Sequence, residues 1–526
     1  MKSPPVLHPY FFAAYAVLGV YSQRPHEIPI IWVVRPTFFI LGIFFLIQLG
    51  LKKTVKDEQR AGFIVTLILA WLFSGHLRNT IYEVFFVKPT FAIDVFLIFS
   101  WGVLLTFLGS IWLWKRIKQP ELLTNFLNVT SWVVIILPLY FVFAFTRQAI
   151  QQNITTRSNG PLVEPVFLTD PGETSPDIYV IILDAYGRED FLHDIFLYDN
   201  SRFISFLEER GFYIGGQSRP NYPQTQLSLA SLLNFQYLTK WSKGLESTNN
   251  REPLNKVIRH SEVHRALEEI GYQIINIPNS TLISDNKDSN VYLPMLNIEI
   301  NQFEGLLIAT TSLEPFIQEW DLKIPVPSHE MHRRTILYQF KVLKSIPLMP
   351  GKKFVYVHIL APHPPFVFDS KGKPVEPPTR YTLADGEGFP GTLYEYQFGY
   401  SEEIEYLNAQ LMEVVSVILE QSANPPIIII QGDHGPGSRF GMVELELEEC
   451  LWERYSILNA YYFPGQNYDS LYPSITPVNS FRVIFNTFFG ESLPLLDDRS
   501  FYATYAAPYL FHEVTDQITE ETCPAK

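Results

Sequence analysis

The stretch that decides the fold is IIIIQGDHG, residues 427–435, in which four isoleucines run into a polar turn that contains Asp433 and His434. A run of β-branched residues bounded by Pro425 and Pro426 on one side and by glycine on the other predicts a fully buried strand. Strands that are buried on both faces belong to parallel sheets packed between helices. Ligands of such sheets bind outside the carboxyl ends of the strands, so we expect Asp433 and His434 to face a binding crevice.

Two further apolar stretches end in the same way. IYVIILDAYG (178–187) predicts a strand that ends at Asp184, and KKFVYVHILAPHPPF (352–366) predicts a strand with His363 near its carboxyl end. Helical patterns lie between the strands, such as the amphipathic stretch 406–422. This alternation predicts an α/β domain with a mainly parallel sheet between helices and right-handed crossover connections.

The polar residues at these strand ends predict a metal site. Taken singly, an aspartate after a strand is often a helix N-cap, and a lone histidine is often structural. Together, Asp184, His363 and the Asp433–His434 pair form a set of carboxylate and imidazole ligands that suits a divalent ion such as zinc or manganese. His358 lies in the same strand as His363, but its alternation phase is typical of an interior residue and leaves it outside the predicted site.

A candidate nucleophile lies in NYPQTQLSLASLLN (221–234), where Thr225 stands at the start of a helix predicted over 225–238. Thr225 is either a simple N-cap or a functional hydroxyl at the positive end of the helix dipole, close to free N–H groups. A metal ion on the same oxygen would lower its pKa and make it a nucleophile at neutral pH. Arg439, just after the metal pair, is a candidate for binding an anionic substrate, with a surface salt bridge as the alternative.

The front of the chain is apolar and basic. Residues 1–147 hold 13 Lys+Arg and 6 Asp+Glu, a net charge of +7, whereas the remainder holds 27 and 48, a net charge of −21. The acidic remainder argues against a nucleic-acid partner, which needs clustered Lys and Arg. A membrane-spanning helix needs about 20 mostly apolar residues. The apolar stretches predict about five such helices, with a re-entrant pair among the first three as the alternative; they lie at about 5–22, 36–51, 61–77, 91–114 and 126–146.

The loops between these stretches predict the orientation. Positive charge gathers at 51–60 and 115–119, and positive loops stay in the cytoplasm. We therefore expect a multi-pass protein of the cytoplasmic (inner) membrane with its N-terminus inside and its C-terminal domain periplasmic or extracellular. The expected organisation is a transmembrane region over 1–147, a linker over 148–177 and a catalytic domain over 178–526.

Three polar residues outside these motifs carry weaker signals. Cys450 and Cys523 are the only cysteines, so no disulfide framework is implied, and whether they pair is left open. Asp94 lies near the start of the fourth apolar stretch and is expected to be interfacial rather than part of a proton relay.

The motifs IYVIILDAYGRED, NYPQTQLSLASLLN, VHILAPHPPFVFD and IIIIQGDHGPGS, in this order behind the apolar block, resemble the sulfatase-like branch of the alkaline phosphatase superfamily. The architecture is similar to that of lipoteichoic acid synthases and lipid A phosphoethanolamine transferases. The resemblance implies that Asp184, Asp433 and His434 bind the metal and that Thr225 is both a ligand and the nucleophile. It also implies that His363 assists proton transfer or binds a second metal, so one or two ions are expected.

The sequence departs from this family in three respects. It has no Cys-x-Pro-x-Arg or Ser-x-Pro-x-Arg motif at the nucleophile, which disfavours a true sulfatase. Asp184 is followed by Ala185, where sulfatases have paired acids and lipoteichoic acid synthases have a glutamate. The disulfide-rich scaffold of the phosphoethanolamine transferases is missing.

The sequence therefore predicts a membrane-anchored, metal-dependent hydrolase or transferase that acts on phosphate esters. The expected donor is a membrane lipid or lipid-linked molecule that gives a phosphoglycerol or phosphoethanolamine group, and the expected acceptor is a cell-envelope glycan, a lipid or water. The alternatives are a catalytically inactive envelope scaffold or sensor and a sulfate-ester hydrolase. A transporter function of the membrane block is the least favoured reading, and the oligomeric state is left open.

Overall fold

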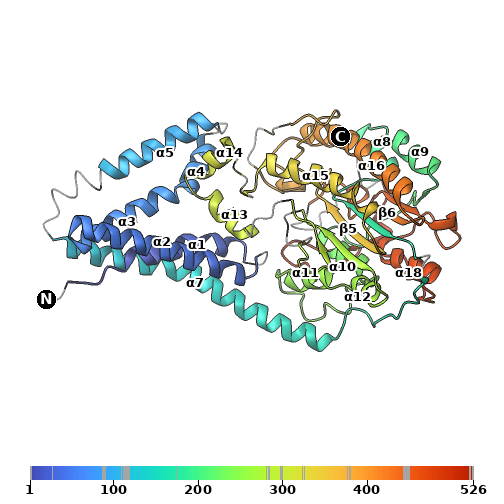
Figure 1. Cartoon of the computed structure of the whole chain (residues 1–526), viewed down its shortest axis with the longest axis horizontal. Helices are drawn as coiled ribbons and strands as arrows, with labels where there is room; N and C mark the ends of the chain where they lie inside the picture. Colours follow the sequence, from blue (N-terminus) through green and yellow to red (C-terminus); the bar gives the residue numbers. More distant parts are fainter. Residues whose placement is uncertain are drawn as a thin grey trace. The chain divides into compact units, whose positions relative to one another are not determined.

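The computed structural model describes residues 3–25, 28–85, 90–107, 109, 119–172, 175–279, 281, 283, 285–295, 300–320, 322, 324, 326–375, 377, 381–441, 450–520 and 523 (Figure 1). The chain divides into two compact units. The first comprises residues 1–150, 296–328 and 378–380, and the second comprises residues 151–295, 329–377 and 381–526. Most of the positive stretch 115–119 and the end of the apolar stretch 91–114 lie outside the described residues.

The first unit is a bundle of apolar helices. In chain order these are α1 (His8–Gln23), α2 (Ile31–Val55), α3 (Glu58–Leu72), α4 (Gly75–Phe85), α5 (Phe91–Thr106) and most of α7 (Pro120–Asn159). Among the described residues, three helical segments are long and apolar enough to cross a membrane: Ile31–Val55, Glu58–Tyr82 and Pro120–Asn159. Helix α5 is apolar but shorter. The described parts of the five predicted apolar stretches are therefore mostly helical, and part of the predicted linker, residues 148–159, continues α7.

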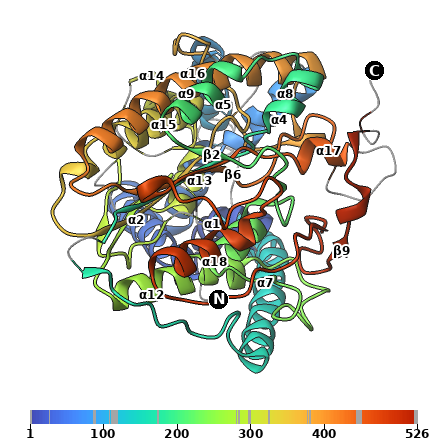
Figure 2. The ribbon, with the colours of Figure 1, turned by 90° about the vertical axis from the view of Figure 1, so that its right-hand side faces the viewer.

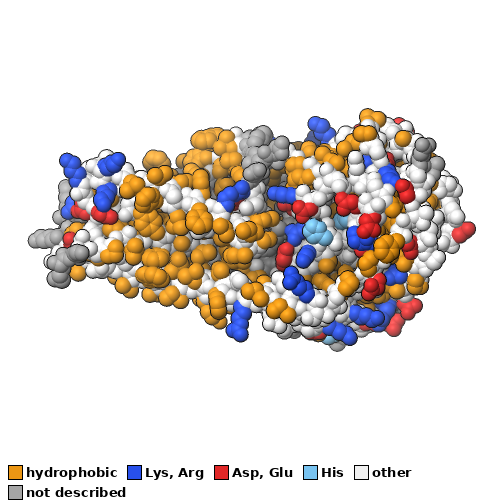
Figure 3. Space-filling model, turned by 60° about the horizontal axis from the view of Figure 1, so that its bottom comes forward, with side chains coloured by type: hydrophobic (Ala, Val, Ile, Leu, Met, Phe, Trp, Pro, Cys, Tyr) orange, Lys and Arg blue, Asp and Glu red, His pale blue; other side chains and the backbone are white. Residues whose placement is uncertain are grey.

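The surface of these helices is apolar, as a lipid-facing surface must be. Figure 3 shows hydrophobic side chains covering the visible face of the bundle. Large apolar side chains that are more than half exposed occur along it, among them Ile31, Phe38, Phe39, Leu46, Phe96, Phe99, Phe126 and Phe143. An exposed apolar surface of this extent is typical of a membrane-embedded region.

A segment from the second half of the sequence completes the first unit. It carries α13 (Gln302–Ala309) and α14 (Glu314–Glu319). Between these helices, the N–H of Ser312 donates to the carbonyl of Leu72, and the carbonyl of Thr310 accepts from the N–H of Gly75. The segment thus satisfies backbone groups at the break between α3 and α4, which a lipid environment would otherwise leave unpaired.

The second unit is an α/β domain built on a seven-stranded sheet. The strands are β1 (Ile178–Leu183), β2 (Tyr213–Ile214), β3 (Gln273–Ile277), β4 (Val291–Tyr292), β5 (Lys353–Ile359), β6 (Ile427–Gly432) and β7 (Asn459–Tyr462). Their order is β2-β7-β6-β1-β5-β3-β4, with β7 antiparallel to β2 and β6 and all other pairs parallel. The predicted class, a mainly parallel sheet between helices, is confirmed.

Helices cover both faces of this sheet (Figures 1 and 2). Side chains of α8 (Glu189–Phe196), α9 (Ser201–Glu209), α15 (His329–Leu343) and α16 (Leu393–Gln421) form one apolar core with one face. Those of α10 (Thr225–Leu233), α11 (Glu252–Arg259), α12 (Glu262–Glu269) and α18 (Pro477–Phe488) form another core with the opposite face. All six residues of β1 and all six of β6 are buried, which explains why neither strand has a polar face.

Candidate metal centre

The central strands bring the two predicted acidic ligands together. Strands β1 and β6 are parallel neighbours, and Leu183 pairs with Gly432. The next residue of each strand, Asp184 and Asp433, therefore emerges at the same edge of the sheet. A carboxylate oxygen of each and a ring nitrogen of His434 lie within 4.8 Å of one another. All three residues are buried, with at most 3% of their surface exposed.

The hydrogen bonds around His434 leave a lone pair that faces the carboxylates. Its Nδ1 lies 3.0 Å from the carbonyl oxygen of Gly435, which can only accept, so Nδ1 carries the proton and Nε2 does not. Nε2 lies 3.5 Å from Oδ1 of Asp184 and 3.4 Å from Oδ2 of Asp433. Neither of these two oxygens has a hydrogen-bond donor among the described residues. Two carboxylate oxygens and a nitrogen lone pair that converge in a buried position fit a divalent cation.

The glycines of the GDHG loop are required by close backbone contacts. A Cβ on Gly432 would lie 2.4 Å from the carbonyl oxygen of Tyr186, and a Cβ on Gly435 would lie 2.0 Å from that of Glu453. The loop turns directly after β6, and the other Asp433 oxygen, Oδ1, accepts from the N–H groups of Ala185 and His434 at 3.1 and 3.0 Å. These two bonds orient the carboxylate so that Oδ2 points to the convergence.

Thr225 lies beside the ring nitrogen of the same three candidate ligands. It is the first residue of α10, whose N-cap position is occupied by Gln224. The Thr225 hydroxyl lies 3.1 Å from Nε2 of His434. The side chain of Ser228, one turn later, donates to the carbonyl of Asp433 and ties the helix to the metal loop. The alternative that Thr225 merely caps its own helix therefore does not account for the position of its side chain.

His358 also belongs to this cluster, although the alternation argument left it out. It is fully buried, as predicted, but its Nε2 lies 3.1 Å from Oδ2 of Asp184. His358 pairs with Ile182 across β1 and β5, so it points to the same face of the sheet as Asp184. Because both faces of this sheet are interior, burial of His358 carried no information about its distance from the site.

A second group of residues lies beside the first. Asp385, which precedes a 3₁₀ turn at Gly386–Gly388, accepts from Nη1 of Arg454 at 2.6 Å and from the hydroxyl of Tyr396 at 2.8 Å. Nε2 of the predicted His363 lies 4.0 Å from Oδ2 of Asp385. Sequence reasoning missed Asp385 and Arg454, because neither ends a strand and no known spacing connects them.

The remaining predicted residue, Arg439, lies just beyond the loop. Its backbone N–H donates to Oε2 of Glu453, and the N–H of Ser438 donates to Oε1 of the same carboxylate. These contacts fix the backbone at Arg439, and the role of its side chain in binding an anion stays a prediction.

The electrostatics favour the protonation states that a metal site needs. Burial raises the pKa of Asp184, but the imidazoles of His363, His358 and His434 outweigh it and hold that pKa well below its usual range. Burial and the charge of Arg454 lower the pKa of His434, against the opposing effect of the carboxylates. At neutral pH the site therefore holds an ionised carboxylate and a neutral imidazole, which are the forms that bind metals.

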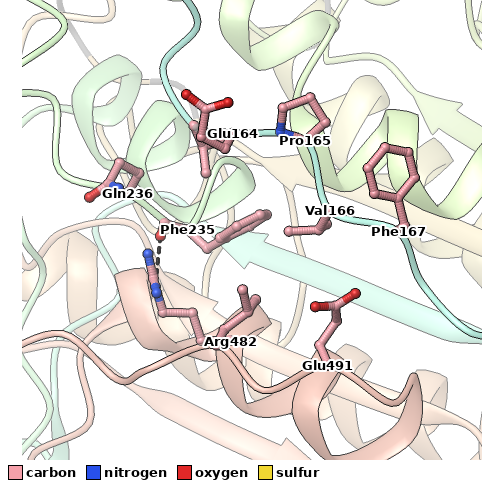
Figure 4. Close-up of a pocket in the computed structure, with 10 residues that line it drawn as sticks. Glu164, Pro165, Val166, Phe167, Phe235, Gln236, Arg482 and Glu491 are labelled. Atoms are coloured by element: carbon pink, nitrogen blue, oxygen red, sulfur yellow. Dashed lines mark hydrogen bonds between the residues drawn. The ribbon is translucent and has the colours of Figure 1, made fainter.

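A separate cavity of about 400 Å³ lies elsewhere in the second unit (Figure 4). Arg482 lines it together with the carboxylates of Glu164 and Glu491, and Nε of Arg482 donates to the carbonyl of Phe235 at 2.9 Å. None of the predicted site residues lines this cavity, so the candidate metal centre and this cavity are distinct features of the domain.

Comparisons with known proteins find similarity in structure. No protein-family model matches the chain, and no curated protein matches it by sequence. The C-terminal periplasmic domain of EcEptC from Escherichia coli, in complex with Zn, is similar at a TM-score of 0.44 and 12% identity, over 68% of this chain and 98% of that one. The phosphonate monoester hydrolase of Agrobacterium radiobacter is similar at a TM-score of 0.38 and 11% identity, over 62% and 80%.

One similar structure extends through the apolar helices. The integral membrane protein lipooligosaccharide phosphoethanolamine transferase A (EptA) from Neisseria meningitidis has a TM-score of 0.38 and 11% identity, over 95% of this chain and 94% of that one. This similarity covers both the apolar helices and the α/β domain.

Proposed function

We propose that this chain is a membrane-anchored, metal-dependent enzyme that transfers or hydrolyses a phosphate-ester group, with Thr225 as its nucleophile. The observation that carries the proposal is the position of the Thr225 hydroxyl. It lies 3.1 Å from the Nε2 of His434 on which the Asp184 and Asp433 oxygens also converge, at the N-terminal end of a helix. A hydroxyl next to a cation site and to free N–H groups is suited to attack phosphorus.

Asp184, Asp433, His434 and Thr225 are the residues that would hold a divalent ion, with zinc or manganese as the expected metals. Such an ion would supply positive charge that lowers the pKa of the Thr225 hydroxyl and stabilises negative charge on the phosphoryl oxygens. Nε2 of His358 lies 3.1 Å from Oδ2 of Asp184, so an N–H at this nitrogen would donate to the carboxylate and orient it.

The reaction proceeds in two steps. In the first, Oγ of Thr225 loses its proton to water and forms a bond to phosphorus, while the bond from phosphorus to the ester oxygen of the donor breaks. The departing oxygen takes a proton from water, because Nδ1 of His363 faces the carbonyl of Pro364 and Nε2, on a side chain that is 12% exposed, is left as an acceptor. In the second step the hydroxyl of an acceptor bonds to phosphorus and gives its proton to His363. The bond to Thr225 Oγ breaks, and Thr225 regains a proton from water.

The apolar helices favour a lipid or lipid-linked donor, because they hold the catalytic unit at a membrane surface. A phosphate ester is favoured over a sulfate ester, because threonine cannot be converted to the aldehyde nucleophile of sulfatases. We expect the acceptor to be an envelope glycan or lipid when the enzyme acts as a transferase, and water when it acts as a hydrolase.

Peptide mass spectrometry of the full-length protein tests this proposal. After incubation with divalent metal and a total lipid extract, we expect an added mass on the peptide that contains Thr225, and its size identifies the transferred group. Thr225→Ala should lose the added mass and turnover while it keeps its bound metal, and Thr225→Ser should retain part of both activities. Turnover by Thr225→Ala at the wild-type rate would refute the mechanism. A wild-type protein that binds metal but neither turns over nor becomes modified would favour the scaffold alternative.

A further inference from the structure

The cavity that lies apart from the candidate metal centre has two facing walls. One wall is the segment 163–167, which follows α7, and the other is formed by Arg482 of α18 with Glu491 and Leu493 of the next loop. Its volume of about 400 Å³ falls within the range of pockets that hold small molecules. Much of the lining is apolar and comes from Val163, Pro165, Val166, Phe167, Phe235 and Leu493.

Hydrogen bonds hold both walls in place. The N–H of Val166 donates to Oε1 of Glu262 at 2.7 Å, and the carbonyl of Val166 accepts from Nη2 of Arg265 at 2.7 Å. On the other wall, the N–H of Glu491 donates to the carbonyl of Phe485 at 3.2 Å. A cavity with fixed walls can bind a ligand without first ordering the chain around it, which favours affinity.

Arg482 brings a buried positive charge to this cavity. It is 5% exposed, and burial lowers the pKa of its guanidinium. Nε donates to the carbonyl of Phe235 at 2.9 Å, and Nη1 donates to that of Pro494 at 2.7 Å. Among the described residues, Nη2 has no acceptor and no carboxylate forms an ion pair with this arginine. A buried cation without a counter-ion is costly, and an anionic ligand would remove that cost.

Two carboxylates, those of Glu164 and Glu491, line the same cavity. Within the described part of the chain, neither side chain has a hydrogen-bond donor or a cation as partner. Figure 4 shows the guanidinium of Arg482 and the carboxylate of Glu491 well apart, both pointing from one wall towards the segment that carries Val166. Because two carbonyls hold the guanidinium, opposite charges face one cavity without neutralising each other.

From this arrangement we infer that the cavity binds a small zwitterion, a molecule that carries an acidic group and an ammonium group on one short carbon chain. The acidic group accepts from Nη2 of Arg482, the ammonium group lies against Glu491, and the carbon chain packs on Val166 and Phe235. A ligand with only one charge binds less well, because it is repelled by the opposite end of the cavity and leaves one charge unpaired. This site does not depend on the reaction proposed at Thr225.

Binding of matched soluble probes is the first test. The ω-amino acids from β-alanine to 6-aminohexanoate carry both groups at increasing separation, whereas hexanoate and hexylamine carry one each. The full-length protein in detergent is first treated with a chelator, so that the candidate metal centre holds no ion for the carboxylate. In isothermal titration, the best ω-amino acid should bind at least about 10-fold more tightly than either single-charge probe, as expected for one additional charged hydrogen bond. No binding at any chain length, or equal affinities for all probes, would overturn the inference.

Charge reversal at Glu491 is the second test. Glu491 is half-buried and its side chain has no partner to lose, so Glu491→Lys should fold. The cavity then becomes positive at both ends, so the preference should invert towards hexanoate; an unchanged preference would overturn the inference. Arg482→Gln should lose hexanoate and the ω-amino acid alike. Arg219→Gln is the matched control and should bind as the wild type does, because Arg219 donates to the carbonyl of Thr515 at 3.1 Å and does not line the cavity.

The same zwitterionic chemistry occurs in free small molecules and in phospholipid headgroups, and nanodiscs separate these two sources. Discs of phosphatidylethanolamine present a zwitterionic headgroup, and discs of phosphatidylglycerol present only an anionic one. If a lipid headgroup fills the cavity, the best ω-amino acid should bind more weakly in the first discs than in the second, and Glu491→Lys should remove the difference. Equal affinity in both discs would assign the cavity to a soluble zwitterion.

Discussion

Two buried carboxylates of the second unit, Asp385 and Glu403, have opposite pKa shifts because their neighbouring groups differ. Burial raises the pKa of Asp385, but Arg454, His363 and His434 outweigh it and lower that pKa to about 2. Burial also raises the pKa of Glu403, and the N–H groups of Val367 and Phe368 oppose it only in part, so that pKa rises to about 8. Asp385 therefore stays ionised in the folded protein at neutral pH, whereas Glu403 is largely protonated.

Glu403 makes the stability of the domain depend on pH. Its folded pKa of about 8 lies above the ordinary value of 4.5, so between these two values the folded chain binds more protons than the unfolded chain. Stability must then fall as pH rises from about 4.5 to 8, by up to about 5 kcal/mol. Glu403→Gln keeps an acceptor for Val367 and cannot ionise. We expect it to match the wild-type melting temperature at pH 5 and to exceed it at pH 8.5.

The measurement is the difference in melting temperature between variant and wild type across this pH range, in detergent. Glu402→Gln, one residue earlier and half-buried, is the control and should leave the pH dependence unchanged. A constant difference between Glu403→Gln and the wild type from pH 5 to pH 8.5 would contradict the raised pKa.

At the level of single residues, the sequence predicted those parts of the candidate site that follow buried strands or begin a helix. Asp184, Asp433 and His434 converge as parallel strands require, and Thr225 joins them from α10. Asp385 and Arg454 could not be found in this way. They come from a loop and from a four-residue helix, and only the tertiary structure brings them together.

At the level of elements, the metal loop depends on a glycine that allows close packing. Gly435→Ala would place a Cβ 2.0 Å from the carbonyl oxygen of Glu453 and 2.8 Å from that of Ser456, both of them backbone atoms. We expect a loss of about 1–3 kcal/mol or more in the free energy of unfolding, together with weaker metal binding, because Asp433 and His434 must shift. Thermal unfolding with and without metal measures both effects.

Gly216→Ala is the matched control for this change, because a Cβ at Gly216 meets no atom within 4 Å. It should melt within a degree of the wild type and bind metal equally well. If Gly435→Ala behaved in the same way, the close packing of the loop would not be what positions the ligands.

The C-terminal segment is held by a disulfide between Cys450 and Cys523, which answers the question that the sequence left open. The bond joins residues 73 apart, and both cysteines are buried. We expect the double variant Cys450→Ser, Cys523→Ser to lose about 2–5 kcal/mol, since the unfolded chain regains the freedom of a long loop. Melting curves with and without reductant check this, and a reductant effect that persists in the double variant would contradict it.

Most elements could be predicted from periodicity and turn residues, but their ends could not. The apolar helical pattern of residues 190–211 forms two helices, because Leu197 adopts a left-handed conformation with φ of 54° that ends α8. The helix predicted to begin at 225 ends at Leu233 rather than at 238. In both cases the apolar pattern continues past the break, so hydrophobicity alone did not mark it.

At the scale of the whole molecule, parts of the chain that lie far apart in the sequence build the first unit together. Arg78 of α4 is buried and pairs with Asp94 of α5 and with Glu314 of α14. Asp94 thus pairs with Arg78 and accepts from the hydroxyl of Tyr82, and its place at the membrane interface stays a prediction. No sequence pattern connects residues 300–320 with the apolar helices, so this return of the chain could not be predicted.

The pair between Arg78 and Glu314 should stabilise the first unit. We expect Glu314→Gln to cost about 1.5–3 kcal/mol, the range for a hydrogen bond to a charged group, as measured by thermal unfolding in detergent. Glu319→Gln, at the exposed end of the same helix, is the control and should change little. Equal melting temperatures for the two variants would mean that the ion pair does not hold this segment.

The return of residues 300–320 to the helical bundle also has a consequence for biosynthesis. When α7 has been synthesised, Arg78 and Asp94 are already present. Glu314, the other carboxylate that pairs with Arg78, is not, because it lies 236 residues after Arg78. The apolar helices are therefore synthesised more than a hundred residues before the segment that completes their unit. A fragment that ends at residue 150 would leave the break between α3 and α4 without Thr310 and Ser312. Such a fragment is expected to be a poor substitute for the native bundle in insertion and quality-control experiments.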